Sequence, residues 1–241
     1  MAAQIIRDSK LWLDKYDVSG DMNAIALAYG AELKDATVLN DAGRRRRGGL
    51  KTLALTLAGY WNGGAGGIDD VLYTDIAVAD VPMTVGAQTG ADGEIAYFFK
   101  ALLGEYKPGA AVGDMFGFQA SGDDSGGDGL IRGTIMGVGA KTVTGTGSIV
   151  QLGAVSAAQK LYAALHVTAF ASITNVIVKI QSATLVGFGS PTDRITFSTA
   201  TGLTSQYATP VAGAITDQFW RAVWTITGAG SVSIVVPVGI Q

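Results

Sequence analysis

The segment LKTLALTLAGYW, residues 50–61, decides the fold class of this chain. Its leucines at positions 53, 55 and 57 alternate with threonine and alanine. A period of two residues places one set of side chains on each face of a β-strand. Residues 23–29, NAIALAY, repeat the alternation with Ile25, Leu27 and Tyr29 on one side. Two such runs close together indicate that β-sheet is the main component of the fold.

Further runs with strand character follow, separated by glycine-rich turns. We expect strands at residues 130–138, 161–170, 173–180, 194–199, 219–227 and 231–238. Many short strands with such turns favour a β-sandwich or a barrel. A segment rich in Gly, Thr, Ser and Ala at residues 140–158 marks a weak boundary. We therefore expect an N-terminal β domain at residues 1–142, while the strands of 143–241 either complete the same sandwich or form a second β domain.

One segment has a helical period instead. Its large apolar residues fall at i, i+3, i+4, i+7 and i+8, and they are Ile95, Phe98, Phe99, Leu102 and Leu103. That spacing lines one face of an α-helix. Gly104 and Pro108 follow as signals that end a helix. The sequence thus predicts one α-helix over about residues 94–103, flanking the sheet.

The composition favours a building element over a catalyst. The 241 residues include 34 glycines, one histidine and no cysteine. Hydrophobic residues make up 48% and charged residues 15%, whereas about 25% charged residues is usual in a soluble domain. Few charges and many small residues fit an obligate oligomer, whose interfaces resemble a domain core. We therefore expect a homo-oligomer.

The same numbers exclude several classes of protein. Without cysteine there is no disulfide framework and no thiolate zinc site. No apolar run approaches the roughly 18 to 20 residues of a membrane-spanning helix, so we expect no membrane insertion. The net charge of −3 gives no general attraction to nucleic acid.

Three motifs that suggest chemistry fail on their spacing. Residues 137–142, GVGAKT, superficially resemble a phosphate-binding loop, but the two positions at which such a loop needs glycine hold Ile135 and Ala140. The acidic turn of Asp123, Asp124 and Asp128 lacks the bidentate Glu of a calcium loop, so a solvated turn is favoured. His166 lies in an apolar run without catalytic partners, which favours a hydrogen-bonded structural role. We expect no catalytic residue, no cofactor and no metal, and hence no enzyme.

Arg44, Arg45, Arg46 and Arg47 carry the strongest functional signal. Flanking Gly, Asn and Asp residues predict an exposed loop at residues 40–49. Four adjacent like charges repel until a partner supplies carboxylates or phosphates. A loop that docks on acidic residues of an adjoining copy and a plain solvated loop remain equal alternatives, and a nucleic-acid contact is less favoured because aromatic residues are not interleaved.

Tryptophans are the other candidate contact residues. Trp61 ends the first strand described above, and Trp220 and Trp224 share one face of a later strand. Packing in a core or an interface is the favoured interpretation, because each indole brings a large apolar area. A carbohydrate-binding platform formed by Trp220 or Trp224 is the alternative.

Several segments together resemble the major tail (tail tube) proteins of long-tailed, siphovirus-like bacteriophages. The similar runs lie at both ends of the chain, at residues 17–27, 49–52, 59–61, 190–197, 216–224 and 238–240. The resemblance implies a β-sandwich or barrel with one flanking helix. In that family six subunits form a ring, and rings stack into a tube through which the genome leaves the particle. A long loop near the N-terminus reaches the adjoining ring, and residues 40–49 match it by position.

The resemblance thus implies a virion structural protein, assembled in the host cytoplasm, that forms hexameric rings stacked into a tail tube. Its expected partners are further copies of itself, the tape-measure protein and other tail proteins, with DNA only as passing cargo. A capsid decoration (cement) protein is the first alternative, and a carbohydrate-binding virion module is the second. Continuous sheets between subunits would also cover the strand edges of a β-rich chain with few charges.

Overall fold

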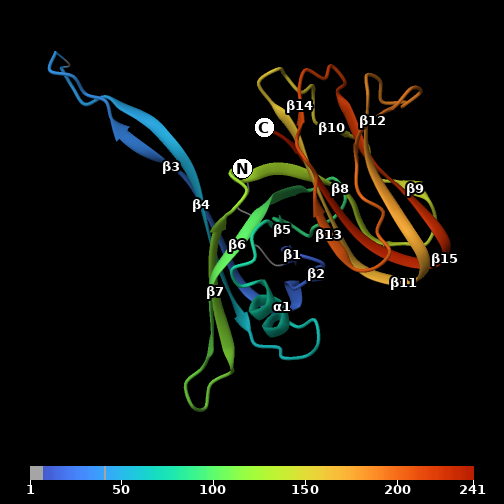
Figure 1. Ribbon diagram of the computed structural model, residues 1–241, viewed down its shortest axis with the longest axis horizontal. Helices are drawn as coiled ribbons and strands as arrows, with labels where there is room; N and C mark the ends of the chain where they lie inside the picture. The colour runs from blue at the N-terminus through green and yellow to red at the C-terminus, as the bar shows by residue number, and fades with distance from the viewer. Residues whose placement is uncertain (1–7, 41) are drawn as a thin grey trace. The chain divides into compact units, whose positions relative to one another are not determined.

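A computed structural model describes residues 8–40 and 42–241 of a mainly β chain (Figure 1). The fold class predicted from the alternating runs is thereby confirmed. The chain divides into two compact units. Unit 1 holds the N-terminal residues up to Gly20 together with Val81–Phe99 and Ile131–Gln241, and unit 2 holds Asp21–Asp80 and Lys100–Leu130.

Unit 1 is an antiparallel assembly of strands with the order β12-β11-β15-β8-β6-β5-β1-β2. Most of these strands are short, and two are very long. They are β1 (Lys10–Leu13), β2 (Tyr16–Asp17), β5 (Val81–Gly86), the start of β6 (Ile95–Gly109), β8 (Ile131–Lys141), β9 (Gly145–Thr146), β10 (Val150–Gln151), β11 (Lys160–Ala183), β12 (Thr192–Thr196), β13 (Thr204–Tyr207), β14 (Val211–Ala212) and β15 (Phe219–Ile240).

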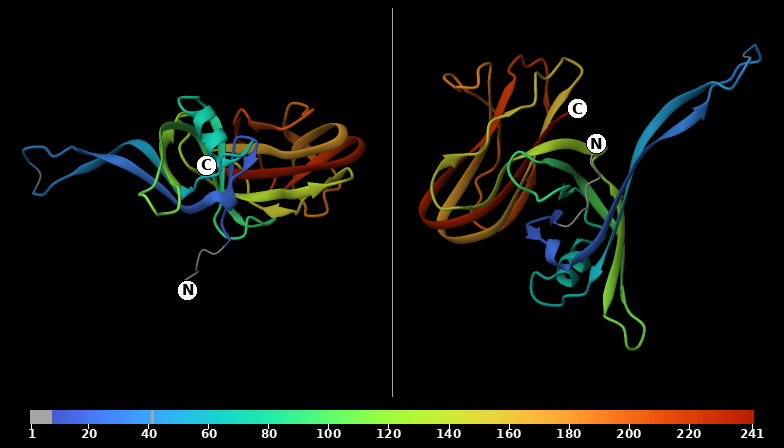
Figure 2. Two further views of the ribbon diagram at one scale, coloured as in Figure 1. Left: turned by 90° about the horizontal axis from the view of Figure 1, so that it is seen from below. Right: turned by 180° about the vertical axis from the view of Figure 1, so that it is seen from behind.

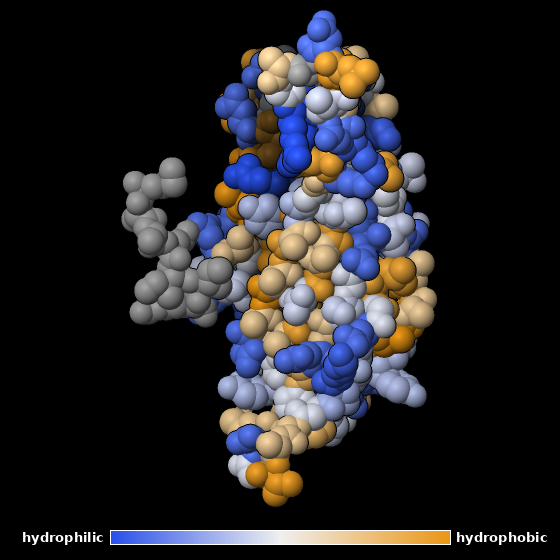
Figure 3. Space-filling model, turned by 90° about the vertical axis from the view of Figure 1, so that its left-hand side faces the viewer, coloured by the Kyte–Doolittle hydropathy of each residue, from blue (hydrophilic) through white to orange (hydrophobic). Residues whose placement is uncertain are grey.

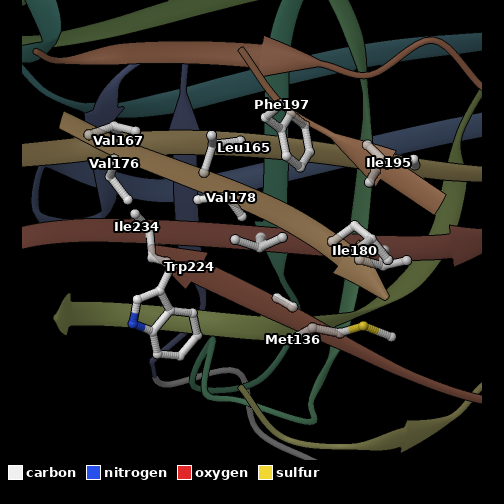
Figure 4. Close-up of a cluster of buried hydrophobic side chains, with 14 of the residues drawn as sticks. Met136, Leu165, Val167, Val176, Val178, Ile180, Ile195, Phe197, Trp224 and Ile234 are labelled. Carbon is white, nitrogen blue, oxygen red and sulfur yellow. The ribbon is translucent and has the colours of Figure 1, made fainter. Parts of the chain in front are cut away.

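The long hairpin of β11 and β15 builds the core of unit 1. The two strands pair from Leu161↔Ile240 to Ala183↔Phe219, with irregular register near the middle. Residues of both halves of each strand are buried in one hydrophobic cluster (Figure 4), in which Leu165 and Val167 come from one half of β11 and Val176 from the other. The irregular register lets alternate residues of both halves face the same core, as expected of a β-sandwich.

Other strands cover both edges of this hairpin. On its outer side β11 pairs with β12, β13 and β14, and β15 pairs with β8, β9 and β10. The pairing between β8 and β15 joins residues on both sides of position 142, where we expected a domain boundary. The division into residues 1–142 and 143–241, with the second part either completing the same sandwich or forming a second β domain, stays a prediction.

Unit 2 contains a sheet with the strand order β3-β4-β7-β6. A short 3-10 helix, η1 (Ser19–Asp21), spans the point in the chain where unit 1 ends and unit 2 begins. The elements that follow in unit 2 are β3 (Met22–Asp35), β4 (Arg46–Tyr60), α1 (Ile68–Asp75), the second part of β6 and β7 (Gly117–Asp124). Leu53, Leu55 and Leu57 of β4 are buried, whereas Ala54 and Thr56 are exposed. The alternation predicted for this strand is therefore present in the structure.

The helix α1 is tied to β6. The Tyr106 hydroxyl on β6 donates to Asp69 Oδ1 at 2.6 Å, and the Ala77 N–H, just after the helix, donates to the Leu103 carbonyl at 2.9 Å. Ile68, Val71 and Leu72 are buried. In the described residues α1 is the one α-helix, so the expectation of a single helix beside the sheet holds but its predicted position does not.

Residues 94–103, predicted as the helix, form strand β6 instead. Ala96 and Phe98 are buried in one phase of the strand, and Phe99, Ala101 and Leu103 are buried in the other. The phase changes where the chain passes from unit 1 to unit 2. The residues of the predicted helical face, Ile95, Phe98, Phe99, Leu102 and Leu103, therefore fall on both faces of the strand, and large apolar residues on both faces of a strand imitate a helical period.

Candidate assembly surface

The hairpin of β3 and β4 is the most exposed part of unit 2. The strands pair from Met22↔Gly59 to Asp35↔Arg46. On its other side β4 pairs with β7, but only from Ala54 to Tyr60. The distal half of the hairpin is therefore a two-stranded ribbon that extends beyond β6 and β7 (Figures 1 and 2). A lone ribbon of this kind is marginally stable in water, so a contact that covers it is expected to stabilise it.

The outer edge of β3 is open. Within the described residues β3 pairs with β4 alone, over a strand of 14 residues. Its first ten residues, MNAIALAYGA at 22–31, include no charged residue and no proline. Natural proteins protect a free edge with lysine, proline, bulges or a short strand, because an unprotected edge pairs with other chains. Over residues 22–31 this edge has a register irregularity but no charge to discourage a partner strand, and the charged residues of β3 follow only at positions 32, 34 and 35.

The hairpin tip, which we define as residues 33–40 and 42–50, carries the four arginines, and position 41 of the expected loop lies outside the described residues. Arg46 and Arg47 belong to β4 and lie opposite Asp35 and Lys34, so the expected open loop at residues 40–49 is shorter than predicted. Arg44 and Arg45 precede the strand. All four are exposed.

Hydrogen bonds order one side of the hairpin tip. The Ala36 N–H donates to the Arg45 carbonyl at 2.9 Å, and the Arg45 N–H donates to Thr37 Oγ1 at 3.0 Å. Thr37 in turn donates to Asp35 through its hydroxyl and its N–H. These bonds stabilise the carboxylate and lower the pKa of Asp35. Leu33, Leu39 and Leu50 are exposed beside them.

The opposite end of β4 exposes aromatic residues. Tyr60 and Trp61 are exposed there, and Trp61 meets Phe116 edge to face with ring centroids 5.4 Å apart. The backbone N–H of Trp61 also donates to the backbone carbonyl of Phe116 at 3.0 Å. Val112 and Met115, in the turn between β6 and β7, are exposed as well. Hydrophobic residues appear at the upper and the lower end of the face in Figure 3.

Acidic residues lie in the chain segments next to Trp61 and Phe116. The first turn of α1 contains Asp69 and Asp70, and Asp114 lies exposed in the turn between β6 and β7. Asp70 Oδ2 accepts the Gly66 N–H at 3.1 Å. Burial, followed by the hydrogen bond to Asp69, raises the pKa of Tyr106, so its hydroxyl stays a proton donor at neutral pH. We call Tyr60, Trp61, residues 62–70 and residues 110–116 the α1 end of unit 2.

The other two tryptophans lie inside unit 1. Trp220 is fully buried and donates from Nε1 to the Gly153 carbonyl at 2.8 Å. Trp224 is also buried and donates to the Val143 carbonyl at 3.0 Å. Stacking with a sugar requires an open ring face, so the carbohydrate platform has no support in this arrangement.

His166 is fully buried in unit 1. Its Nδ1 contacts the Asp14 carbonyl, which can only accept, so Nδ1 carries the proton. Its Nε2 lies 2.8 Å from Thr84 Oγ1 and accepts from that hydroxyl. Burial lowers the pKa of His166 to about 4, because the charged ring would lose its hydration. The ring is neutral at pH 7 and bonded on both sides.

A buried ionic cluster was not visible in the sequence. Asp217 accepts from Ser182 at 2.7 Å, from Thr184 at 2.9 Å and from Arg194 at 2.9 Å. The hydrogen bond from Ser182, followed by that from Arg194, lowers the pKa of Asp217. Ser182 and Thr184 lie two residues apart at the end of β11, whereas Arg194 on β12 and Asp217 before β15 come from farther along the chain. Their mutual satisfaction indicates a structural role.

The acidic turn after β7 binds its own backbone. Asp124 accepts the Gly126 N–H at 3.2 Å and the Gly129 N–H at 3.1 Å. Among the described residues, no group of three or more His, Cys, Asp and Glu side chains is placed to hold a metal ion. Within residues 8–40 and 42–241, no helix has the length and apolar character needed to cross a membrane.

Comparison with known structures finds tail assemblies. The chain is similar to a protein of the virion of a native gene transfer agent particle, with 16% identity over 52% of this chain and 95% of that one and a TM-score of 0.42. A chain in the tail of an empty gene transfer agent particle with C6 symmetry gives 14% identity, 47% and 90% coverage and a TM-score of 0.37.

The chain is also similar to Dit of phage SPP1, a hub adsorption apparatus protein, with 10% identity over 98% of this chain and 100% of that one and a TM-score of 0.38. These neighbours are phage tail structures. No protein-family model and no curated protein sequence matches the chain.

Proposed function

We propose that the chain is a structural subunit of a phage tail tube, which assembles with identical copies into hexameric rings that stack around a tape-measure protein. The open edge of β3, which is uncharged over residues 22–31, carries this proposal. A strand edge of this length needs a neighbour, and an identical chain is the neighbour that is always present. The subunit acts mechanically in the virion, and DNA passes through the tube without specific contact.

A ring requires a heterologous contact. If β3 paired with β3 of another copy, the two-fold contact would close as a dimer and no ring would grow. We therefore place β3 of one subunit beside a different strand edge of the next. Repetition of this contact around a six-fold axis covers every β3 edge, and no subunit keeps a free one.

The test places charge on the edge strand and, as a control, on its inner neighbour. Ala26 and Ala28 of β3 lie opposite Thr56 and Ala54 of β4, and all four are exposed on the same face. We expect Ala26→Lys with Ala28→Lys to abolish rings and tubes in electron micrographs of the purified protein. Ala54→Lys with Thr56→Lys should leave assembly intact, because β4 has neighbours on both sides.

Equal loss of assembly in both double variants would place the contact on the face of the sheet and contradict the role of the edge. Circular dichroism of each variant checks that the subunit stays folded. Trimers that bind only to capsids would instead support the decoration protein. A wild-type protein that stays monomeric at high concentration, with tail components present, would overturn the proposed function altogether.

A further inference from the structure

The two ends of unit 2 have opposite charge. Residues 31–51, which include the hairpin tip, contain six Lys and Arg residues against three Asp and Glu. Residues 62–80, which lead into and through α1, contain four Asp residues and no Lys or Arg. Strand β4 joins the two ends, with Arg46 as its first residue and Tyr60 as its last. At about 3.3 Å per residue, these ends of β4 lie roughly 45 Å apart.

Both ends also expose apolar side chains. The hairpin tip presents Leu33, Leu39 and Leu50, and the α1 end presents Trp61, Met115 and Phe116. Clustered apolar exposure beside charge is typical of an interaction surface. Aromatic residues and arginines are also the residue types enriched where protein interfaces bind most strongly. Each end thus combines charged and apolar residues, as a protein interface does, and the charges at the two ends are opposite in sign.

We infer that the hairpin tip of one copy docks on the α1 end of unit 2 of another copy. The inference rests on the proposed function only in that the partner is a second copy of this chain. Arginines 44–47 face the carboxylates of Asp70 and Asp114, and the leucines of the tip cover the Trp61–Phe116 pair. The planar guanidinium group suits this role because it binds a carboxylate through two parallel hydrogen bonds.

The direction of such a contact has a structural consequence. The two docking surfaces differ, so the contact is head to tail, and each copy keeps one free tip and one free α1 end. A contact of this kind does not close as a dimer and continues from copy to copy. It is distinct from pairing along the β3 edge, and it supplies a second direction of growth.

The natural absence of cysteine permits a clean cross-linking test. Leu39→Cys labels the tip and Met115→Cys labels the α1 end, and both positions are exposed and uncharged. We expect a mixture of the two single variants to form disulfide dimers under assembly conditions. The double variant should form a ladder of longer products, whereas each single variant alone should not.

A matched pair controls for random collision. Leu185 in unit 1 is as exposed as Met115, so Leu39→Cys mixed with Leu185→Cys should give at least about tenfold less cross-linked dimer if the contact is specific. Equal yields from the two mixtures would overturn the inference.

A charge exchange tests the chemistry of the contact. Arg44→Glu with Arg47→Glu should lower the yield of the Leu39–Met115 cross-link by about tenfold, and Asp70→Arg with Asp114→Arg should do the same. Combining all four substitutions should restore the yield. If the combination restores nothing, or if the arginine variants lose DNA binding and keep the cross-link, the tip has another partner and the inference is wrong.

The outcomes separate the inference from the proposed function. Rings or tubes that form without the Leu39–Met115 cross-link would overturn the docking contact and leave the tail tube subunit in place. Failure of the wild-type protein to assemble in any form would overturn both. Cross-linked chains without rings would support the docking contact and contradict the ring.

Discussion

The chain contains two long β-hairpins that differ in what surrounds them. The hairpin of β11 and β15 in unit 1 has further strands on both edges, and burial alternates along part of each strand and is continuous along another part, as at residues 161–167 of β11. The hairpin of β3 and β4 in unit 2 has one open edge, and most of its residues are exposed. Both are rich in alanine and larger aliphatic residues, which are mostly Ile and Val in the first hairpin and mostly Leu in the second.

The difference shows that composition alone does not determine whether a strand is buried. In unit 1 the chain supplies its own neighbours, and apolar side chains from both halves of the hairpin share one core. In unit 2 the chain provides a neighbour for β4 over part of its length and none for the outer edge of β3. The first hairpin stabilises the subunit, and the second is available for assembly.

The largest expected effect tests the closed hairpin. Trp220→Ala removes a fully buried indole and its hydrogen bond to Gly153, so it should lower the free energy of unfolding by about 3–5 kcal/mol. Leu39→Ala, at the exposed hairpin tip, should change it by less than about 0.5 kcal/mol. Urea unfolding followed by tryptophan fluorescence and circular dichroism measures both. Similar losses would remove the contrast between the hairpins.

The next effect is a pH dependence that comes from the dry interior of unit 1. The pKa of His166 is lowered from 6.5 to about 4 in the folded protein, so the unfolded state binds more protons between these values. Stability from this group is fully present above pH 6.5 and falls by up to about 3 kcal/mol as the pH drops to 4.

His166 is the one histidine of the chain, so its ring resonances in the NMR spectrum of the untagged protein are unambiguous. They should show no titration between pH 5 and 8. A midpoint near pH 6.5 would mean that water reaches the ring and that the core is open.

A smaller effect is expected at the ionic cluster of unit 1. Asp217→Asn removes the charge opposite Arg194 and weakens its bonds with Ser182 and Thr184, at a cost of about 2 kcal/mol. The lowered pKa of Asp217 means that its contribution is present above the carboxyl's ordinary pKa and is lost as the pH falls through the folded value. The free energy of unfolding of the variant should therefore fall less steeply at acid pH than that of the wild type.

Asp193→Asn is the matched control, because Asp193 forms an exposed pair with Lys179. Its cost in thermal or urea unfolding should stay below about 1 kcal/mol. Equal costs for the two variants would show that the Asp217 cluster is no better shielded than the surface.

The smallest effect on stability should belong to the arginines. Changing Arg44, Arg45, Arg46 and Arg47 together to Ser should leave the unfolding free energy within about 1 kcal/mol, since all four are exposed. Assembly should be impaired far more than folding. Light scattering at physiological salt compares polymerisation of the variant with the wild type, and unaltered polymerisation would remove the docking role of the tip.

Short alternations in the sequence predicted strands well, but not their lengths. The leucines at 53, 55 and 57 identified β4 correctly. Strands β11 and β15 were each predicted as two shorter strands, because Ser172 and Gly228 resemble turn residues. Both adopt positive φ, and they lie where the pairing register shifts inside the hairpin. A local bulge and a chain reversal use the same residue types, so the sequence does not distinguish them.

The helix shows a different limit. Helix α1 begins at Ile68, after the glycine-rich residues 62–67, and Gly67 gives it no side-chain cap. With glycines before the helix, the sequence lacks the start signal that Ser or Asp would have provided.

The position of the arginines near an exposed tip was predictable from four adjacent charges. The α1 end was not, because strand pairing brings Trp61 to Phe116 from far along the chain.

The uncharged run at residues 22–31 also affects the time before assembly. Until its outer edge is occupied, this segment of the free subunit is open to pairing with any extended peptide. Under the proposed function, newly made subunits therefore benefit from low free concentration and rapid capture by a growing end. Production at high level of the isolated chain should then yield irregular polymers or aggregates as well as the proposed tubes.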